Sequence, residues 1–440
     1  MSKKRKIIIF CVFIMQCISL FSISTHSESN DISEETFDMV IISSNSFKNE
    51  IQPLINHKQS MHLHTFFQTT ESIYDNYQGI DSSEKIKYFI KDSIEQYNIK
   101  YVLLIGDIEK IPIRKTAVTW EYFGDLVVKD VITDFYYEDI YDKNMNFSSW
   151  DTNHNGIFSE VQMITNDMED NETFHYIDQI DLISDISVGR LPCKTKKEVE
   201  TTIEKIIEYE TETSGSSWFN KIILIGGDTF PNIGEMNEGE YVTDYIASKM
   251  KDFQAIKLWT SLKTFSPIKI NQAINKGAGF VSYSGHGFSN GFGTSQPNSD
   301  SIKHYYTPYI LGLFNNNKYP IMYFDACLTA SLDYQKFNRN VPCFAWSMVK
   351  KPFGGAIASI GSTRIGYGGF VGDPLGAGSP SLHTLFFNSY VPGIYLGDMF
   401  IQAKKSYAET ICIEGFDDCL TLQEFILIGD PSLKIGGYKK

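Results

Sequence analysis

The chain alternates between short apolar runs and longer segments in which apolar residues recur every three or four positions. Phe37–Ser44 and Lys100–Asp107 are short, rich in Ile, Val and Leu, and end in polar residues, so they are predicted as buried strands. Glu84–Tyr97 and Thr195–Glu210 have the spacing of amphipathic helices, and the second begins with a threonine suited to N-capping. The polar stretch Thr211–Asn220 interrupts this pattern and is predicted to separate two parts of the chain.

The same pattern restarts after this boundary. Further apolar runs are predicted as strands at Lys221–Asp228, Gly277–Gly285, Tyr319–Ala326 and Phe353–Thr363, and periodic segments as helices at Gly239–Met250, Ser381–Tyr390 and Leu396–Glu409. Strands that alternate with helices indicate an α/β fold with mostly parallel sheets. We therefore predict two consecutive α/β subdomains, at residues 35–215 and 216–440.

The beginning of the chain has a different pattern. Lys3–Lys6 is basic, Ile7–Ile23 is apolar, and a polar stretch with small residues follows. This order is typical of a secretory signal peptide, which we expect over residues 1–27. The protein is then secreted or held at the cell surface. The alternative is an uncleaved membrane anchor, and only in that case is membrane contact expected.

Composition narrows the class of partner. The formal net charge is −14, from 39 Lys and Arg against 53 Asp and Glu, so nucleic acid is not an expected partner. Of the seven cysteines, two lie in the apolar start, and the remainder are Cys193, Cys327, Cys343, Cys412 and Cys419. This remainder is odd, so at least one thiol is unpaired within the chain. Cys412 and Cys419 are close enough in sequence to pair, which the sequence alone does not decide.

Two of the predicted strands end in residues that suit nucleophilic catalysis. His286 lies between glycines directly after one strand, and Cys327 follows another strand 41 residues later (327 − 286). Neighbouring parallel strands bring their carboxyl ends to the same edge of a sheet, where the two side chains would share a crevice. A histidine can draw the proton from a cysteine thiol and return it to a leaving amine. The alternatives are an exposed turn histidine and a small buried core cysteine.

A serine also lies in this region. Gly287–Gly291 matches the G-x-S-x-G pattern of serine hydrolases around Ser289. That pattern requires a helix directly after the serine, whereas residues rich in Gly, Ser, Pro and Asn follow here. We therefore do not expect Ser289 to be a nucleophile.

Several segments, in the same order along the chain, resemble the gingipain family of cysteine peptidases, which shares a clan with caspases and legumains. They are "YVLLIGD", "SVGRLP", "YSGHG" followed by "GFGTS", "NVPCFAWSM" and "LIGDPSLKI", and the resemblance extends from Phe37 to Ile435. It implies a caspase-like catalytic unit in the second subdomain and a cysteine endopeptidase acting on proteins or peptides. Two other outcomes stay open: a relative that transfers the acyl group to an amine, and an inactive exported binding protein of the same fold.

The resemblance also implies roles for individual residues. Cys327 is the nucleophile, His286 is the general acid and base, and the backbone N–H groups of Gly287 and Cys327 form the oxyanion hole. An acidic residue at the end of an earlier strand orients the histidine, and Asp228 occupies that position. A carboxylate at the same sheet edge suits this role on its own chemistry, and the alternative for Asp228 is a cap of a turn or helix.

Basic-specific gingipains read the substrate side chain before the scissile bond (P1) with an acidic pocket residue. Glu238 or Glu240 lies where that residue belongs, although carboxylates also occur at helix starts for structural reasons. Tyr367 is expected in a pocket wall. The family glycine soon after the cysteine is missing from "ACLTASLD", which leaves the pocket shape open. A basic P1 residue is slightly favoured.

A further loop resembles the start of a calcium-binding loop. Its D-x-N-x-N-G pattern places oxygen ligands at alternate positions around a glycine turn, and Gln162 stands where an EF-hand requires glutamate. The expected ligands are Asp151, Asn153, Asn155, Ile157 through its carbonyl, and Glu160. Gingipain-like proteins carry calcium, so the resemblance implies a structural ion here. The alternative is a polar turn, and no organic cofactor is expected.

Overall fold

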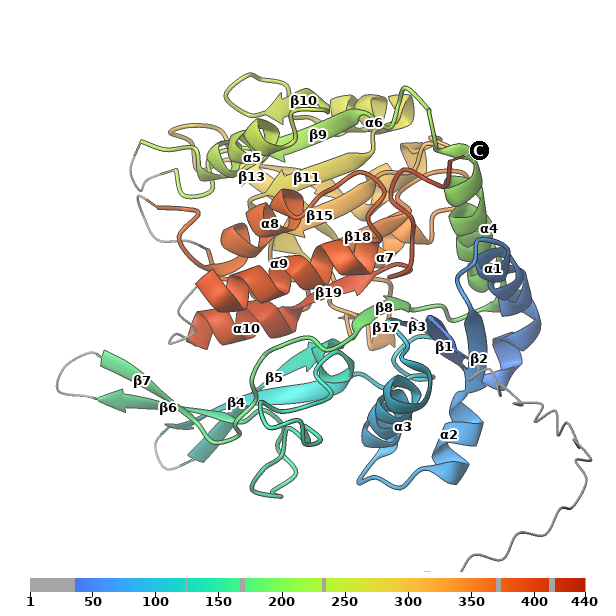
Figure 1. Ribbon diagram of the computed structural model, residues 1–440. Coiled ribbons are helices and arrows are strands. Elements are labelled where there is room, and N and C mark those ends of the chain that lie inside the picture. The colour runs from blue at the N-terminus through green and yellow to red at the C-terminus, as the bar shows by residue number, and fades with distance from the viewer. Residues whose placement is uncertain are drawn as a thin grey trace, which may run out of the picture. The chain divides into compact units, whose positions relative to one another are not determined.

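A sheet of ten strands forms the centre of the protein (Figure 1). The computed structural model describes residues 36–122, 125–166, 171–231, 235–368, 373–410 and 416–439. The expected signal peptide and Cys412 lie outside these residues. In sheet order the strands are β10 (Gln254–Trp259), β9 (Lys221–Gly226), β11 (Phe280–Ser284), β15 (Ile321–Asp325), β18 (Ala358–Ser362), β19 (Phe425–Ile428), β8 (Ser187–Leu191), β3 (Tyr101–Ile105), β1 (Met39–Ser43) and β2 (Thr65–Thr69).

Every neighbouring pair in this sheet is parallel except β18 and β19, which are antiparallel. The inner strands are buried along their whole length, which is why they appear in the sequence as continuous apolar runs. Strand β19 pairs with β18 on one side and with β8 on the other, so strands from both predicted subdomains belong to a single sheet. The predicted α/β class with mostly parallel strands is confirmed.

Helices pack against this sheet (Figure 1). They are α1 (Lys48–Ser60), α2 (Thr70–Asn76), α3 (Ser82–Tyr97), α4 (Lys196–Glu212), α5 (Glu238–Lys249), α6 (Pro267–Lys276), α7 (Phe344–Val349), α8 (Gly378–Asn388), α9 (Leu396–Thr410) and α10 (Phe416–Glu424). Helix α4 begins with a capping box, in which Thr195 and Glu198 satisfy each other's backbone N–H groups. In the described residues, no helix has both the length and the apolar content needed to cross a membrane.

Three smaller sheets surround the main one. Strands β4 (Arg114–Tyr122), β5 (Asp125–Thr133), β6 (Val161–Asn166) and β7 (Asn171–Tyr176) form a sheet inserted between β3 and β8. The sequence analysis expected an insertion with a calcium loop in this part of the chain, but none of these strands. Strands β12 (His286–Phe288), β13 (Gly291–Ser295) and β14 (Ile302–Tyr306) form the second, and β16 (Gln335–Lys336) and β17 (Arg339–Asn340) the third. The sheet of β12, β13 and β14 begins at the carboxyl end of β11 and carries one of the predicted catalytic residues.

Candidate active site

The two predicted catalytic residues follow the ends of two neighbouring strands, at equivalent positions along them. Strands β11 and β15 are parallel, and their last residues, Ser284 and Asp325, are paired in register. His286 and Cys327 each follow two residues after that pair. The equal spacing brings the histidine and the cysteine together at one edge of the sheet, as the sequence analysis expected.

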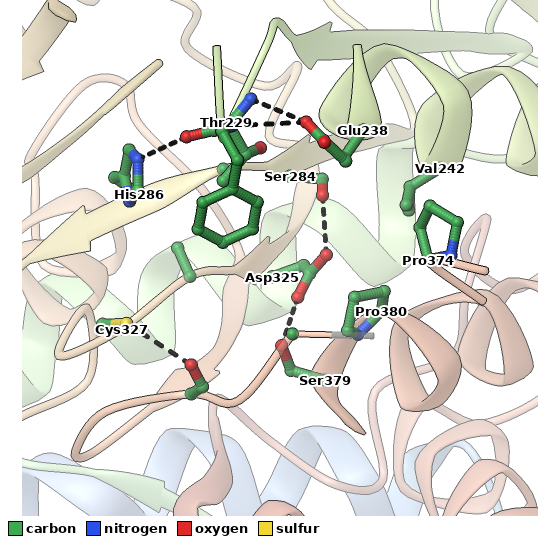
Figure 2. A pocket seen from close by; sticks show the side chains of 15 residues that line it. Thr229, Glu238, Val242, Ser284, His286, Asp325, Cys327, Pro374, Ser379 and Pro380 are labelled. Carbon is green, nitrogen blue, oxygen red and sulfur yellow. Dashed lines mark hydrogen bonds between the residues drawn. The ribbon is translucent and has the colours of Figure 1, made fainter. Parts of the chain in front are cut away.

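Gly287 lies directly against the cysteine. A Cβ atom added to Gly287 would stand 2.1 Å from the Cys327 carbonyl oxygen and 2.8 Å from the Cys327 backbone nitrogen. Real side chains do not approach backbone atoms so closely, so only glycine fits at this position. His286 and Cys327 both line a cavity of about 260 Å³ (Figure 2).

One nitrogen of the His286 ring is held by the backbone. Nε2 lies 2.9 Å from the carbonyl oxygen of Thr229, and since a carbonyl only accepts, Nε2 carries the proton and donates. The ring of Phe230 stands at 90° to the imidazole with a centroid separation of 6.0 Å. These contacts fix the ring orientation and leave Nδ1 as the nitrogen that can accept a proton.

The role expected for Asp228 stays a prediction. The described residues show no hydrogen bond between its carboxylate and the imidazole, and the bond that holds the ring runs from Nε2 to the carbonyl oxygen of the next residue, Thr229. The backbone of Asp228 is bound to Ser295, the last residue of β13, by two hydrogen bonds of 3.1 Å each. Its Oδ1 atom is buried without a hydrogen-bond partner among the described residues, and burial raises the pKa of its carboxyl.

The surroundings of Cys327 favour the protonated thiol over the thiolate. Its sulfur donates to the carbonyl oxygen of Gly366 over 3.6 Å. Burial raises the pKa of the Cys327 thiol, and the negative charges of Glu424 and Asp325 raise it further. A base must therefore take the proton before the sulfur can act as a nucleophile, and His286 lines the same cavity.

The two predicted pocket carboxylates lie in different surroundings. Glu238 lines the cavity, and its Oε2 accepts hydrogen bonds from the backbone nitrogens of Thr229 (3.0 Å) and Phe230 (3.3 Å). Glu240 does not line this cavity: it is buried beside Thr260 and Ser261, and it accepts from the Ser261 backbone nitrogen over 2.9 Å. The alternative of a structural carboxylate near a helix start therefore describes Glu240.

Tyr367 also does not line the cavity. Its ring packs against a separate apolar cluster formed by Val118, Val131, Val161 and Leu420. Its neighbours Gly366 and Gly368 line the cavity instead, and the Tyr367 carbonyl oxygen accepts from the Ser379 backbone nitrogen over 2.8 Å. The segment thus contributes backbone rather than an aromatic ring to the cavity.

The sequence analysis missed several residues that line the cavity. The carboxylate of Asp325 is one of them, and it lies between the hydroxyl groups of Ser284 and Ser379 (Figure 2). Val242, Pro374 and Pro380 provide an apolar wall. The position of Asp325, the last residue of a buried strand and two before Cys327, was the signal that could have identified it.

The predicted calcium loop closes around its own oxygen atoms. Asp151 accepts from the backbone nitrogens of Asn155 and Gly156, each over 3.0 Å. The side chain of Asn155 accepts from the Ile157 nitrogen over 2.8 Å and donates to Glu160 over 2.7 Å. Gly156 has a φ of 81°, which suits the sharp turn that such loops require.

The donor set of this loop fits a hard cation. Asp151, Glu160 and Asp178 are buried, and the described residues offer none of them an ion pair with Lys, Arg or His. No three His, Cys, Asp or Glu side chains in the described ranges converge enough to hold a metal by themselves. The ligands would therefore have to include amide oxygens, such as those of Asn153 and Asn155, which calcium accepts.

Known proteins match this chain over most of its length. The model of peptidase family C25 matches residues 32–436. Gingipain R2 of Porphyromonas gingivalis (strain ATCC BAA-308 / W83) is 24% identical over 345 residues, which cover 75% of this chain and 37% of that protein. Lys-gingipain HG66 of Porphyromonas gingivalis is 25% identical over 193 residues, which cover 43% of this chain and 10% of that protein. The chain thus spans well under half the length of either relative.

Solved structures share the fold. The crystal structure of the Arg specific cysteine proteinase gingipain R matches with a TM-score of 0.65 and 21% identity, covering 91% of this chain and 78% of that chain. The complex of the pro- and mature domains of RgpB from Porphyromonas gingivalis matches with a TM-score of 0.64 and 20% identity, covering 90% and 79%. Both structures support the same α/β architecture.

Proposed function

The chain belongs to peptidase family C25, as its resemblance to gingipains predicted, and we propose that it is a cysteine endopeptidase whose nucleophile is Cys327. The observation that carries this proposal is the register of β11 and β15, after which His286 and Cys327 both line one cavity. A buried thiol with a raised pKa has little nucleophilic character alone, so a neighbouring base is essential.

The first half of the reaction forms a thioester. Nδ1 of His286 takes the thiol proton while the sulfur of Cys327 attacks the carbonyl carbon of the scissile bond. The backbone N–H groups of Gly287 and Cys327 stabilise the oxygen that becomes negative. His286 then gives its proton to the departing amine, and the C–N bond breaks.

The second half returns the enzyme to its resting state. Water loses a proton to His286 and attacks the thioester carbonyl carbon. The C–S bond breaks, the acid product leaves, and the histidine proton returns to the sulfur of Cys327. Throughout both halves, the Thr229 carbonyl oxygen holds Nε2–H, so the same ring nitrogen acts as base and as acid.

A basic P1 residue suits the charge of the cavity. Glu238 and Asp325 line it, and the described lining residues include no Lys or Arg. The names of two matched proteins, an Arg specific proteinase and a Lys-gingipain, point to the same class of side chain. We accordingly propose protein or peptide substrates cleaved after basic residues.

Export and a structural calcium ion complete the proposal. Export is supported by the basic and apolar pattern of residues 1–27. The loop from Asp151 to Glu160 would hold calcium through carboxylate, amide and carbonyl oxygens, and the ion would stabilise the insertion between β3 and β8. The ion would supply no chemistry to the reaction, because its loop contributes no residue to the lining of the catalytic cavity.

Thiol reactivity tests the proposed nucleophile directly. Cys193, Cys343 and Cys419 are buried, whereas Cys327 is partly exposed, so the other thiols serve as internal controls. Iodoacetamide under native conditions, followed by peptide mapping, should label Cys327 first, and His286→Ala should slow that labelling. Equal labelling of Cys327 in both proteins would count against a catalytic pair. Added amine nucleophiles would separate hydrolysis from acyl transfer by product analysis.

A further inference from the structure

One of the carboxylates that line the catalytic cavity is buried. Asp325 is only 4% exposed, yet it is one of the residues that line the cavity. It ends β15 and precedes Cys327 by two residues. In Figure 2 its carboxylate lies between the Cys327 side of the cavity and the apolar wall formed by Val242, Pro374 and Pro380.

Two hydroxyl groups hold this carboxylate in place. The Ser379 hydroxyl donates to Oδ1 over 2.5 Å, and the Ser284 hydroxyl donates to Oδ2 over 2.7 Å. Ser284 belongs to β11, and Ser379 lies in the first turn of α8, so two separate elements fix the orientation. Each carboxylate oxygen can accept about two hydrogen bonds, so both retain capacity for a ligand.

The negative charge of Asp325 has no cationic partner of its own. His383 is the only basic side chain that the described residues place within ion-pairing distance, with Nδ1 at 3.8 Å from Oδ2. That histidine is fully buried, and burial lowers its pKa, so it is neutral near pH 7. A buried charge without a counterion is costly, and a cation brought by a ligand would offset the cost.

The shape of the cavity fits a long cationic side chain. The methylene groups of arginine or lysine would pack against Val242 and Pro380, and Figure 2 places that apolar wall next to Asp325. Glu238 adds a second negative charge on another wall. Its Oε2 is already committed to the backbone nitrogens of Thr229 and Phe230, whose loop holds His286.

We propose that Asp325 is the residue that selects a positively charged P1 side chain, and that Glu238 acts mainly by holding the Thr229 loop against His286. This inference rests on the proposed peptidase function. It differs from the expectation carried by the family resemblance, which assigned the acidic pocket residue to Glu238 or Glu240. The cation donates hydrogen bonds to Asp325.

The two carboxylates then have separable effects on catalysis. Asp325→Asn keeps the size of the side chain, and it can bond both serines if one hydroxyl turns to accept from the amide nitrogen, so the main loss is the charge. Glu238→Gln weakens the hold on the Thr229 loop, which should lower kcat for every substrate. A specificity residue instead changes the ratio between charged and neutral substrates.

A second readout of Asp325 requires no substrate. The negative charges of Asp325 and Glu424 both raise the pKa of the Cys327 thiol. Of the other titratable groups nearby, Tyr283 lies near the sulfur and His286 lines the same cavity. Removing the charge of Asp325 lowers the pKa of the thiol, so more thiolate is present near neutral pH. Iodoacetamide, which is uncharged, should label Cys327 faster in Asp325→Asn than in the wild type.

The deciding experiment compares peptide substrates that differ only in charge at P1: arginine against citrulline, and lysine against norleucine. The wild type should prefer the charged member of each pair in kcat/KM by roughly 10- to 100-fold. Asp325→Asn should lose most of this preference while still cleaving citrulline peptides. Glu238→Gln should keep the preference at lower kcat. Asp75→Asn, an exposed position in α2, is the matched control and should behave like the wild type.

The results that would contradict the role of Asp325 differ from those that would contradict the peptidase function. A wild type that cleaves citrulline as well as arginine peptides, or an Asp325→Asn enzyme that keeps the preference, overturns the role of Asp325 and leaves the peptidase intact. A protein that cleaves no peptide and shows no selective labelling of Cys327 overturns the proposed function and this inference with it. Should Asp325→Asn fail to fold, the size-matched pair Asp325→Glu and Asp325→Gln replaces it: the charge preference must survive only in Asp325→Glu.

Discussion

Ser284 and Asp325 are paired in register at the ends of two parallel strands, and this pair sets the level of the candidate active site. His286 and Cys327 each lie two residues beyond this pair. The Ser284 hydroxyl donates to the Asp325 carboxylate over 2.7 Å and so joins the two strand ends. One pairing in the sheet thus aligns the residues proposed as base, as nucleophile and as the carboxylate that binds the substrate side chain.

His286 and Ser289 lie three residues apart, and substitution should separate their roles. His286→Ala removes the base and should lower kcat/KM by roughly 100-fold or more, as is usual for a general acid or base. Ser289→Ala should retain activity, because the Ser289 hydroxyl is bound to the Ser331 hydroxyl over 2.9 Å rather than to a catalytic group. Steady-state kinetics on a basic P1 peptide would measure both. An inactive Ser289→Ala with a normal melting temperature would reopen the serine-hydrolase pattern.

Asp228→Asn should reduce activity by less than about tenfold. The Nε2–H group of His286 donates to the Thr229 carbonyl oxygen, so the orientation of the ring does not depend on the Asp228 carboxylate. A carboxylate that orients a catalytic histidine directly costs about 10⁴-fold in kcat when it is converted to the amide. Measured kcat therefore distinguishes the two arrangements, and a loss in the thousands would restore Asp228 to the direct role.

Removal of calcium should destabilise the fold. A ligand that binds only the native state stabilises it by about 2.7 kcal/mol at 100 times its Kd, so a chelator should lower the melting temperature and added calcium should restore it. Asp151→Asn should abolish that response. Asp142→Asn is the control, because Asp142 caps an exposed turn of its own through Asn144 and Asn146. A melting temperature that does not change when the chelator is added would rule out the proposed calcium site.

A buried ion network joins α1 and α4 to the end of the chain. Lys58 lies 2.8 Å from Glu210 and 2.7 Å from Asp430, and all three side chains are buried. Burial tends to raise the pKa of the Glu210 carboxyl, but Lys58 and His57 outweigh it, so the pKa is lowered. A lowered carboxyl pKa contributes stability above about pH 4.5 and loses it as the pH falls through the folded-state pKa.

Glu210→Gln should therefore destabilise the protein by about 3–5 kcal/mol at pH 7, because Lys58 loses one of its two buried partners. The difference in the free energy of unfolding between variant and wild type should become smaller in acid, where Glu210 is protonated in both the folded and the unfolded state. Glu212→Gln, at an exposed position of the same helix, should change stability by less than about 0.5 kcal/mol. Urea unfolding at several pH values measures all three proteins. A difference in the free energy of unfolding that does not change with pH would contradict the role given to Glu210 in this ion network.

The sequence predicted the parts of the fold that are buried most uniformly. Strands such as β9, β11 and β15 are covered on both faces, so they appear as unbroken apolar runs. The insertion sheet was missed because a strand such as β4 (RKTAVTWEY) carries charged and threonine residues among its apolar ones, which weakens the pattern. Strands of this kind are set by their pairing partners rather than by their own composition.

The residues of the candidate site also differ in how well the sequence predicts them. Cys327 and His286 could be predicted as candidates because each follows an apolar strand, which is a local signal. The Thr229 carbonyl was missed because every residue has a carbonyl, and only the fold decides which one faces the ring. Asp325 was missed because its role depends on Ser379, which lies 54 residues away in the sequence.

Cleavage of a peptide library varied at P1, by the wild type and by Cys327→Ala in parallel, tests the central claim most directly. The account predicts that the wild type, with calcium and a reductant present, cleaves after arginine or lysine, and that Cys327→Ala cleaves nothing. Cleavage that persists in Cys327→Ala, or a folded wild type that cleaves no member of the library, would contradict it.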